Sequence, residues 1–149
     1  MTVPGELARL LTGRPDIGAA EQAFPFLTVD EAGFPHAALL SRAEVDVTPD
    51  GSAVLAVIAS RRTRANITRD GHAGLIAVAG TTAHYVKLSV LRAIETPAAI
   101  GCVMRVTEHK ADSLGIPLSP IGFVTTPEIA HLEDWDASQQ LLSRLAENR

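Results

Sequence analysis

The stretch SAVLAVIASRRTRANITRDGHAGLIAVA, residues 52–79, governs how this chain is expected to fold. Residues 52–59 and 73–79 are apolar on both faces, a pattern that is typical of buried strands. Residues 60–71 between them hold four arginines at helix-compatible spacing and close on Gly71, a residue type that commonly ends helices. The stretch therefore predicts two buried strands joined by a short basic helix.

The segments on both sides of this stretch add further strands. Upstream, the apolar run 24–29 and the turn 30–33 lead into a long second strand, whose second half alternates apolar and polar residues up to Val47. Downstream, residues 84–95 and 100–109 alternate in the same way. About six strands joined mostly by short turns favour one antiparallel β-barrel, with the basic helix after the third strand.

The two ends of the chain are expected to be helical. Residues 5–12 and 136–147 each carry three leucines on one helical face. Residues 114–127 hold three prolines and two glycines and predict a loop with a short strand at 121–124. We expect one domain, which comprises an N-terminal helical segment (residues 1–23), the barrel (24–109) and a loop with the C-terminal helix (110–149).

The composition excludes several classes of protein. The chain has 149 residues, of which 46% are hydrophobic, and its net charge of −4 argues against a basic nucleic-acid binder. No apolar run reaches the roughly 18 residues of a membrane helix, and the first residues lack the features of a signal peptide, so a cytoplasmic location is expected. The single cysteine, Cys102, excludes an internal disulfide, and the five histidines show no metal-ligand spacing, so no metal is expected.

The segment Ser60–Asn66 (SRRTRAN) has the residue types that hold a phosphate. Arginine supplies paired donors, serine and threonine supply hydroxyls, and the free N–H groups in the first turn of a helix point the same way. The alternative is a solvated helix face on which the arginines pair with acidic residues. Spacing alone leaves both interpretations open, and neither implies a particular reaction.

Three motifs occur in an order found in one known superfamily. The first is FxTVDExGxPH, which starts at Phe26; the others are NITRDG at residues 66–71 and HYVKL at residues 84–88. In this order they resemble the pyridoxamine 5′-phosphate oxidase-like, FMN-binding split β-barrel superfamily, over a match from about Phe24 to Glu95. The resemblance implies a mainly β (α+β) fold, a six-stranded antiparallel split β-barrel with flanking N- and C-terminal helices.

The resemblance also implies a homodimer with two FMN sites at the subunit interface. The second strand would run under the flavin ring, and the end of the third strand with the start of the helix would hold the phosphate. The partner subunit would bring Tyr85 near the ring. The cofactor-binding residues implied in this way are His36, Ala38, Leu39, Leu40, Ser41, Ser60, Arg61, Arg62, Thr63, Asn66 and Tyr85.

The chain departs from the superfamily pattern at two of these positions. Thr63 stands where the superfamily usually has a phosphate-binding lysine, and Ser41 replaces another basic residue. The arginine and histidine pattern with which pyridoxamine phosphate oxidases bind their substrate is not apparent in the C-terminal tail, so oxidation of vitamin B6 is not expected.

The function expected from these residues is that of a flavin-dependent oxidoreductase that binds FMN and acts on an unknown substrate. No catalytic residue is identified. One alternative is a reductase that uses the deazaflavin F420, whose acidic tail Arg64 and Arg69 would meet. Another is a non-catalytic dimeric protein that binds flavin or haem. A dimer is expected on separate grounds too, because short alanine-rich strands leave apolar faces that a chain of this length covers only in part.

Overall fold

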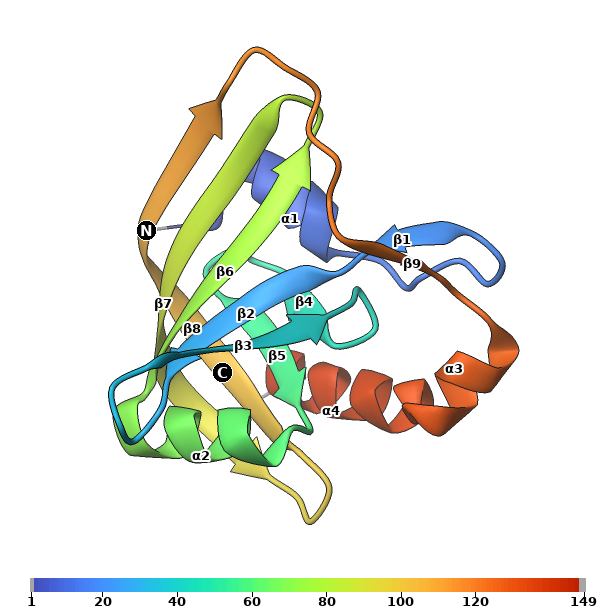
Figure 1. The fold of residues 1–149 in the computed structure, drawn as a ribbon. Helices are drawn as coiled ribbons and strands as arrows, with labels where there is room; N and C mark the ends of the chain where they lie inside the picture. The colour runs from blue at the N-terminus through green and yellow to red at the C-terminus, as the bar shows by residue number, and fades with distance from the viewer. Residues whose placement is uncertain (1, 148–149) are drawn as a thin grey trace.

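The computed structural model describes residues 2–147 and has at its centre a curled antiparallel sheet of seven strands (Figure 1). The strand order is β3-β2-β6-β7-β8-β5-β4, and every neighbouring pair is antiparallel. The strands are β2 (Phe24–Val29), β3 (Pro35–Leu40), β4 (Val45–Val47), β5 (Val54–Ile58), β6 (His72–Ala79), β7 (Thr82–Glu95) and β8 (Ile100–Ser113).

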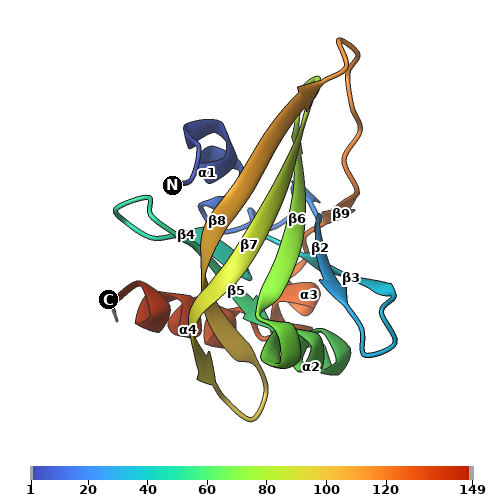
Figure 2. The same cartoon turned by 90° about the vertical axis from the view of Figure 1, so that its left-hand side faces the viewer.

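Helices and a small second sheet surround the main sheet. The helix α2 packs against β2 and β3, and α4 packs across β5 and β8 (Figure 2). The second sheet pairs β1 (Ala20–Gln22) with β9 (Gly122–Val124). The helices are α1 (Gly5–Leu11), α2 (Arg61–Asp70), α3 (Pro127–Leu132) and α4 (Trp135–Glu147). No helix within residues 2–147 is long and apolar enough to cross a membrane.

The expected fold class, a mainly β split barrel with a helix after the third long strand, is confirmed, but the sheet has seven strands instead of six. The extra strand arises because the long second strand breaks at a turn. The Glu44 N–H donates to the carbonyl of Ser41 at 2.9 Å, which reverses the chain after β3. As a result β4 leaves β2 and pairs with β5, so a segment that alternates as one strand in the sequence is divided in two.

Two elements, β1 and α3, were not expected. The strand β1 pairs with β9, which lies where the sequence predicted a short strand, and α3 begins at the end of the predicted loop. The Thr126 side chain accepts a hydrogen bond of 3.1 Å from the Ile129 N–H, and Pro127 lies in the first helical turn. Threonine before proline is a common helix start, so the last proline of the expected loop begins a helix instead.

Two hydrophobic clusters form the core. The larger lies on the inner face of the curled sheet, where Phe26 and Leu75 pack with Leu7 and Leu11 of α1. The second lies between α4 and the strands β5 and β8. The amphipathic helix predicted at the C-terminus thus packs its leucine face against β5 and β8. In this position α4 forms one side of the site described below.

Close approach of α4 to β8 depends on a glycine. A β-carbon added at Gly101 would lie 2.9 Å from both Leu141 Cγ and Leu145 Cδ1. We therefore expect Gly101→Ala to lower the free energy of unfolding by about 1–3 kcal/mol through overpacking. Urea denaturation measures this loss. Gly74→Ala is the control, because its added β-carbon would come no closer than 3.6 Å to any neighbour; equal stability of the two variants would contradict the argument.

A chain of hydrogen bonds ties α1 to the upper part of the sheet. The ring of His84, which is 2% exposed, contacts Glu6 Oε1 through Nε2 at 3.0 Å and His109 Nε2 through Nδ1 at 2.9 Å. An ionised carboxylate only accepts, so Nε2 of His84 carries the hydrogen, and its Nδ1 accepts from the His109 N–H. Each ring nitrogen of His84 therefore has a hydrogen-bond partner.

This chain of hydrogen bonds predicts a loss of stability in mild acid. Burial and the neighbouring His84 lower the pKa of His109. Between that lowered pKa and about 6.5 the unfolded chain binds more protons, so the free energy of unfolding is expected to fall as pH drops below about 6.5. His109→Gln keeps a donor for His84 without titrating, and its stability measured from pH 7.5 to 5.5 should vary less. Parallel profiles for the two proteins would contradict this.

Candidate functional site

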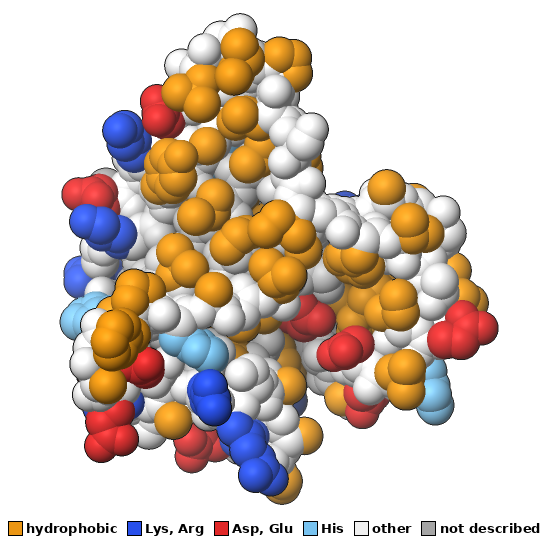
Figure 3. Space-filling model, viewed as in Figure 1, with side chains coloured by type: hydrophobic (Ala, Val, Ile, Leu, Met, Phe, Trp, Pro, Cys, Tyr) orange, Lys and Arg blue, Asp and Glu red, His pale blue; other side chains and the backbone are white. Residues whose placement is uncertain are grey.

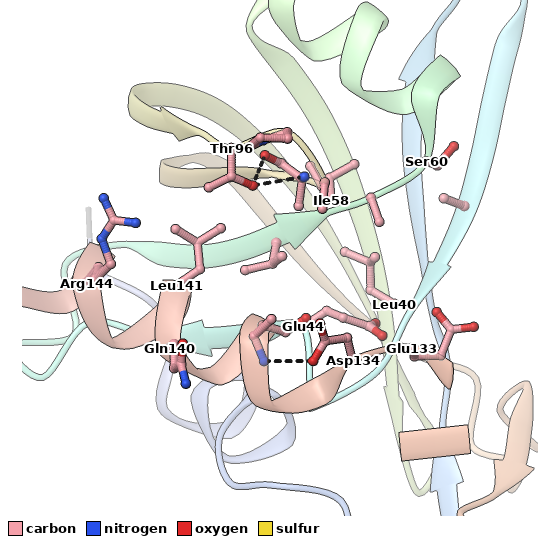
Figure 4. Close-up of a pocket in the computed structure, with 18 of the residues that line it drawn as sticks. Leu40, Glu44, Ile58, Ser60, Thr96, Glu133, Asp134, Gln140, Leu141 and Arg144 are labelled. Carbon is pink, nitrogen blue, oxygen red and sulfur yellow. Dashed lines mark hydrogen bonds between the residues drawn. The ribbon is translucent and has the colours of Figure 1, made fainter. Parts of the chain in front are cut away.

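A cavity of about 640 Å³ lies between the sheet and α4 (Figure 4). Its walls come from the end of β3, the end of β5, the turn between β7 and β8, and α4 with the two residues before it. Leu40, Ile58 and Leu141 supply apolar surface from three of these elements. The volume lies within the range of roughly 300–1,000 Å³ that small-molecule sites occupy.

The start of α2 borders this cavity. Ser60 lines the cavity and is the residue that precedes the helix. The first turn of α2 contains no acidic residue, and no side chain caps it. Within residues 2–147, Arg61 and Arg62 are exposed and form no ion pair, and the backbone N–H groups of residues 61–63 have no hydrogen-bond acceptor. The helix dipole adds positive potential at the same point, so this end of the cavity attracts anions.

Buried side chains fix α2 at this position. Asn66 donates from Nδ2 to Thr28 Oγ1 at 2.9 Å, and its Oδ1 accepts from Arg69 at 3.1 Å. Thr63 is fully buried and donates to the Ser60 hydroxyl at 3.3 Å. Both residues were predicted to bind the cofactor, but neither lines the cavity: Asn66 joins the helix to β2, and Thr63 supports Ser60 from inside the helix.

The turn that covers the cavity is held by the same helix. Arg64 donates to the carbonyl of Thr96 at 2.9 Å and to that of Pro97 at 3.3 Å. Within the turn, the Thr96 hydroxyl and the backbone of Ala99 exchange hydrogen bonds (Figure 4). One arginine thus connects the wall of the cavity to its basic end.

Acidic residues gather on another side of the cavity, near the start of α4. Glu44, Glu133 and Asp134 line it there (Figure 4). Burial raises the pKa of Glu44, the charge of Glu133 raises it further, and the Ser41 N–H and the side chains of Ser41 and Trp135 oppose the shift. Sequence analysis missed these residues, because Glu44 belongs to an ordinary alternating pattern and the other two belong to a helix start 90 residues away.

The structure brings part of the expected site together. Ala38, Leu39, Leu40 and Ser60 line the cavity, and Arg61 and Arg62 follow Ser60 at its edge. Besides Thr63 and Asn66, three expected residues lie outside the cavity lining. His36 faces Thr28 across the β2–β3 pair, Ser41 is buried in the turn after β3, and Tyr85 lies on β7, outside the cavity lining.

An apolar surface covers the side of the sheet that faces away from the core. Figure 3 shows hydrophobic side chains spread across the face that β2, β3 and β6 form. Alternation along paired strands assigns its members, which we call the outer sheet face: Pro25, Leu27, Val29, Ala37, Leu39, Ile76, Val78 and Tyr85. Val29, Leu39 and Tyr85 are 49%, 55% and 42% exposed. In proteins generally, contiguous exposed apolar surface is typical of interaction sites.

Residues 2–147 contain neither a cluster of metal ligands nor an exposed thiol. No group of three or more His, Cys, Asp or Glu side chains there could hold a metal ion. Burial raises the pKa of the Cys102 thiol to about 12, and the residue is fully buried in the larger hydrophobic cluster. Cys102 therefore remains a protonated core residue, since a reactive cysteine needs an exposed thiolate.

Comparison with solved structures identifies the fold. A flavin reductase of styrene monooxygenase (SMOB) from Pseudomonas putida S12 superposes with a TM-score of 0.53 at 12% identity, over 72% of this chain and 88% of that chain. An F420 reductase gives 0.54 at 15% identity, over 72% and 98%. The flavin reductase PheA2 gives 0.52 at 13% identity, over 72% and 87%. No family model and no curated protein matches the sequence significantly.

These structures share the split β-barrel fold of the pyridoxamine 5′-phosphate oxidase-like proteins. The resemblance inferred from the sequence motifs is therefore confirmed at the level of the fold.

Proposed function

We propose that this split-barrel chain binds FMN, with the phosphate at the start of α2 and the ring in the adjoining cavity, and acts as a flavin-dependent oxidoreductase. One observation carries the proposal: Arg61, Arg62 and the first N–H groups of α2, which have no partner within residues 2–147, stand at the edge of an apolar cavity large enough for a small-molecule ligand. The neighbouring structures described as flavin reductases support the same kind of function.

The residues at the start of α2 fit a phosphate group. Two guanidinium groups, the Ser60 hydroxyl and the backbone N–H groups of the first turn would donate charge-assisted hydrogen bonds. Thr63 is too deeply buried to replace the missing lysine directly, so Arg61 and Arg62 supply the positive charge.

The cavity fits the ring system through its apolar walls. Leu40, Ile58 and Leu141 would contact the faces of the ring and exclude water from it. When bound, FMN would supply two-electron redox chemistry, while the chain binds and orients it.

The F420 alternative is weakened by the contacts of two arginines. The acidic tail of F420 was expected to bind Arg64 and Arg69. Arg64 instead donates to two carbonyls of the β7–β8 turn, and Arg69 donates to the carbonyl of Val29 and to Asn66. Both guanidinium groups are thus used inside the chain, which favours FMN over F420, although one structural neighbour is described as an F420 reductase.

We also propose that two copies of the chain associate through the outer sheet face. Apolar side chains on β2, β3, β6 and β7 make this surface, and Leu39 at the sheet edge belongs both to it and to the cavity wall. A symmetric dimer would bury the surface and bring the partner's copy of the face near the cavity.

An absorbance spectrum of the purified protein, followed by titration with FMN and with F420, tests the cofactor. Flavin bands in the purified protein, or tighter binding of FMN than of F420, would support the proposal. A colourless protein that binds neither cofactor would overturn it. Reduction of the bound flavin by NAD(P)H, with reoxidation faster than for free flavin, would separate an enzyme from a non-catalytic flavin or haem carrier.

A further inference from the structure

The cavity is polarised, with positive groups at one edge and negative groups at another. Ser60 and the start of α2 border it on the basic side, and Glu44, Glu133 and Asp134 line it near the start of α4 (Figure 4). The walls between these groups are mainly Leu, Val, Ile and Ala side chains. A ligand with an anionic group at one end and a hydrogen-bond donor at the other would therefore enter in one orientation only.

Glu44 is the acidic residue that the fold holds most firmly. Its N–H donates to the Ser41 carbonyl at 2.9 Å, and its own carbonyl accepts from the Val57 N–H at 2.8 Å. Its side chain accepts from the Ser41 N–H through Oε2 at 2.6 Å. A carboxylate offers about four lone-pair sites, so this bond leaves capacity on the side that faces the cavity. In contrast, Glu133 and Asp134 are exposed.

The charge of Glu44 is poorly compensated in the described residues. Glu133 and Asp134 add negative charge from the start of α4, whereas β3 and β5 contribute no charged side chain to the cavity. Arg144, the single Lys or Arg among the described residues that line the cavity, forms no ion pair within residues 2–147.

A buried donor lies beside the same carboxylate. The Trp135 indole is 4% exposed, and its Nε1 has no hydrogen-bond partner of ordinary geometry among the described residues. A weak hydrogen bond from this indole lowers the pKa of the Glu44 carboxyl, against the effect of burial. Glu44 itself is half-buried and lines the cavity, so a ligand can reach the acceptor capacity that Ser41 and Trp135 leave free.

We propose that Glu44 accepts a hydrogen bond from an N–H group on the ligand edge opposite the phosphate, which in FMN is the imide N–H of the ring. The inference rests on the proposed function and goes beyond it, because it fixes which edge of the ring meets the acidic side of the cavity. An N–H donor there would offset the negative charge of Glu44 and Glu133, and an anionic edge would be rejected. Glu44 is thus a specificity-determining residue.

The test compares FMN with 3-methyl-FMN, in which a methyl group replaces the imide hydrogen, by fluorescence titration of the wild type, Glu44→Ala and Glu44→Gln. Loss of a hydrogen bond to a charged group should weaken binding about tenfold to a hundredfold. We expect 3-methyl-FMN to bind the wild type this much more weakly than FMN. On Glu44→Ala the two ligands should bind alike, which is the signature of a coupled pair.

The pH dependence gives a second readout. Protonation of Glu44 would compete with the ligand N–H, so wild-type affinity for FMN should fall as pH drops. The phosphate of FMN itself titrates near pH 6, so the informative quantity is the extra fall in the wild type relative to Glu44→Gln. Asp46→Asn is the matched control, because Asp46 also has a raised pKa but does not line the cavity. It should bind like the wild type.

The outcomes separate the two proposals. If FMN fails to bind the wild type at all, the proposed function fails and this inference fails with it. If FMN binds but 3-methyl-FMN binds the wild type equally well, this inference alone is overturned. That comparison uses only unmodified protein, so it stands even if the Glu44 variants do not fold.

Discussion

Replacing Arg61 and Arg62 together with alanine is expected to weaken FMN binding about a hundredfold or more. Each guanidinium would donate charge-assisted hydrogen bonds to the phosphate, and bonds of this kind contribute about 1.5–3 kcal/mol each. Neither arginine forms an ion pair within residues 2–147, and both are exposed, so their removal costs the fold little. Fluorescence titration of the double variant measures the loss.

Riboflavin, which lacks the phosphate, provides the internal control for this experiment. Its affinity for the double variant should equal its affinity for the wild type, because the cavity walls are unchanged. Arg105→Ala removes an exposed arginine from β8, outside the cavity, and should leave FMN binding as it was. Equal FMN affinity in the wild type and the double variant would show that the start of α2 does not hold the phosphate.

Replacing Ile76 with glutamate is expected to convert a dimer into a monomer. Ile76 lies on β6, opposite Tyr85 on the neighbouring strand, at the centre of the outer sheet face. In a symmetric dimer the two glutamates would be buried in an apolar interface without partners, which costs several kcal/mol per charge. Sedimentation at micromolar concentration should therefore show a mass near twice 15.7 kDa for the wild type and near 15.7 kDa for the variant.

Leu132→Glu is the matched control for this change. Leu132 is 81% exposed on α3 and does not belong to the outer sheet face, so a charge there should leave the dimer intact. A monomeric wild type would refute the dimer, and an Ile76→Glu variant that stays dimeric would refute the choice of interface. Circular dichroism should give the same spectrum for both variants, because neither residue belongs to the buried core.

Most strands and the basic helix could be predicted because their signals are local. The apolar runs around β5 and β6 differ in period from the arginine-rich segment between them, and Gly71 ends α2 in the left-handed conformation, φ 68°. The missed break after β3 has a local cause too, but a weak one. Residues 42–47 keep a period of two through the turn at Ser41–Glu44, so the pattern does not reveal where the strand changes partner.

The candidate site could be predicted only at its basic edge. Ser60, Arg61 and Arg62 are neighbours in the sequence, and their residue types suffice to suggest a phosphate. Residues such as Glu44 and Glu133 carry no such signal, because their proximity depends on how α4 docks against β5 and β8. From the sequence, Arg64 and Arg69 were candidates to bind the acidic tail of F420, whereas tertiary contacts occupy both.

By itself, the sequence determined the alternation of strands, the basic start of α2 and the excess of apolar strand surface, since each follows from the order of side chains along a short segment. Only the tertiary structure decided that α4 would close a cavity beside α2 and that Glu44 would face into it. The physical reason is that α4 reaches β8 through a close approach at Gly101, a contact between residues some 40 positions apart that no local pattern records.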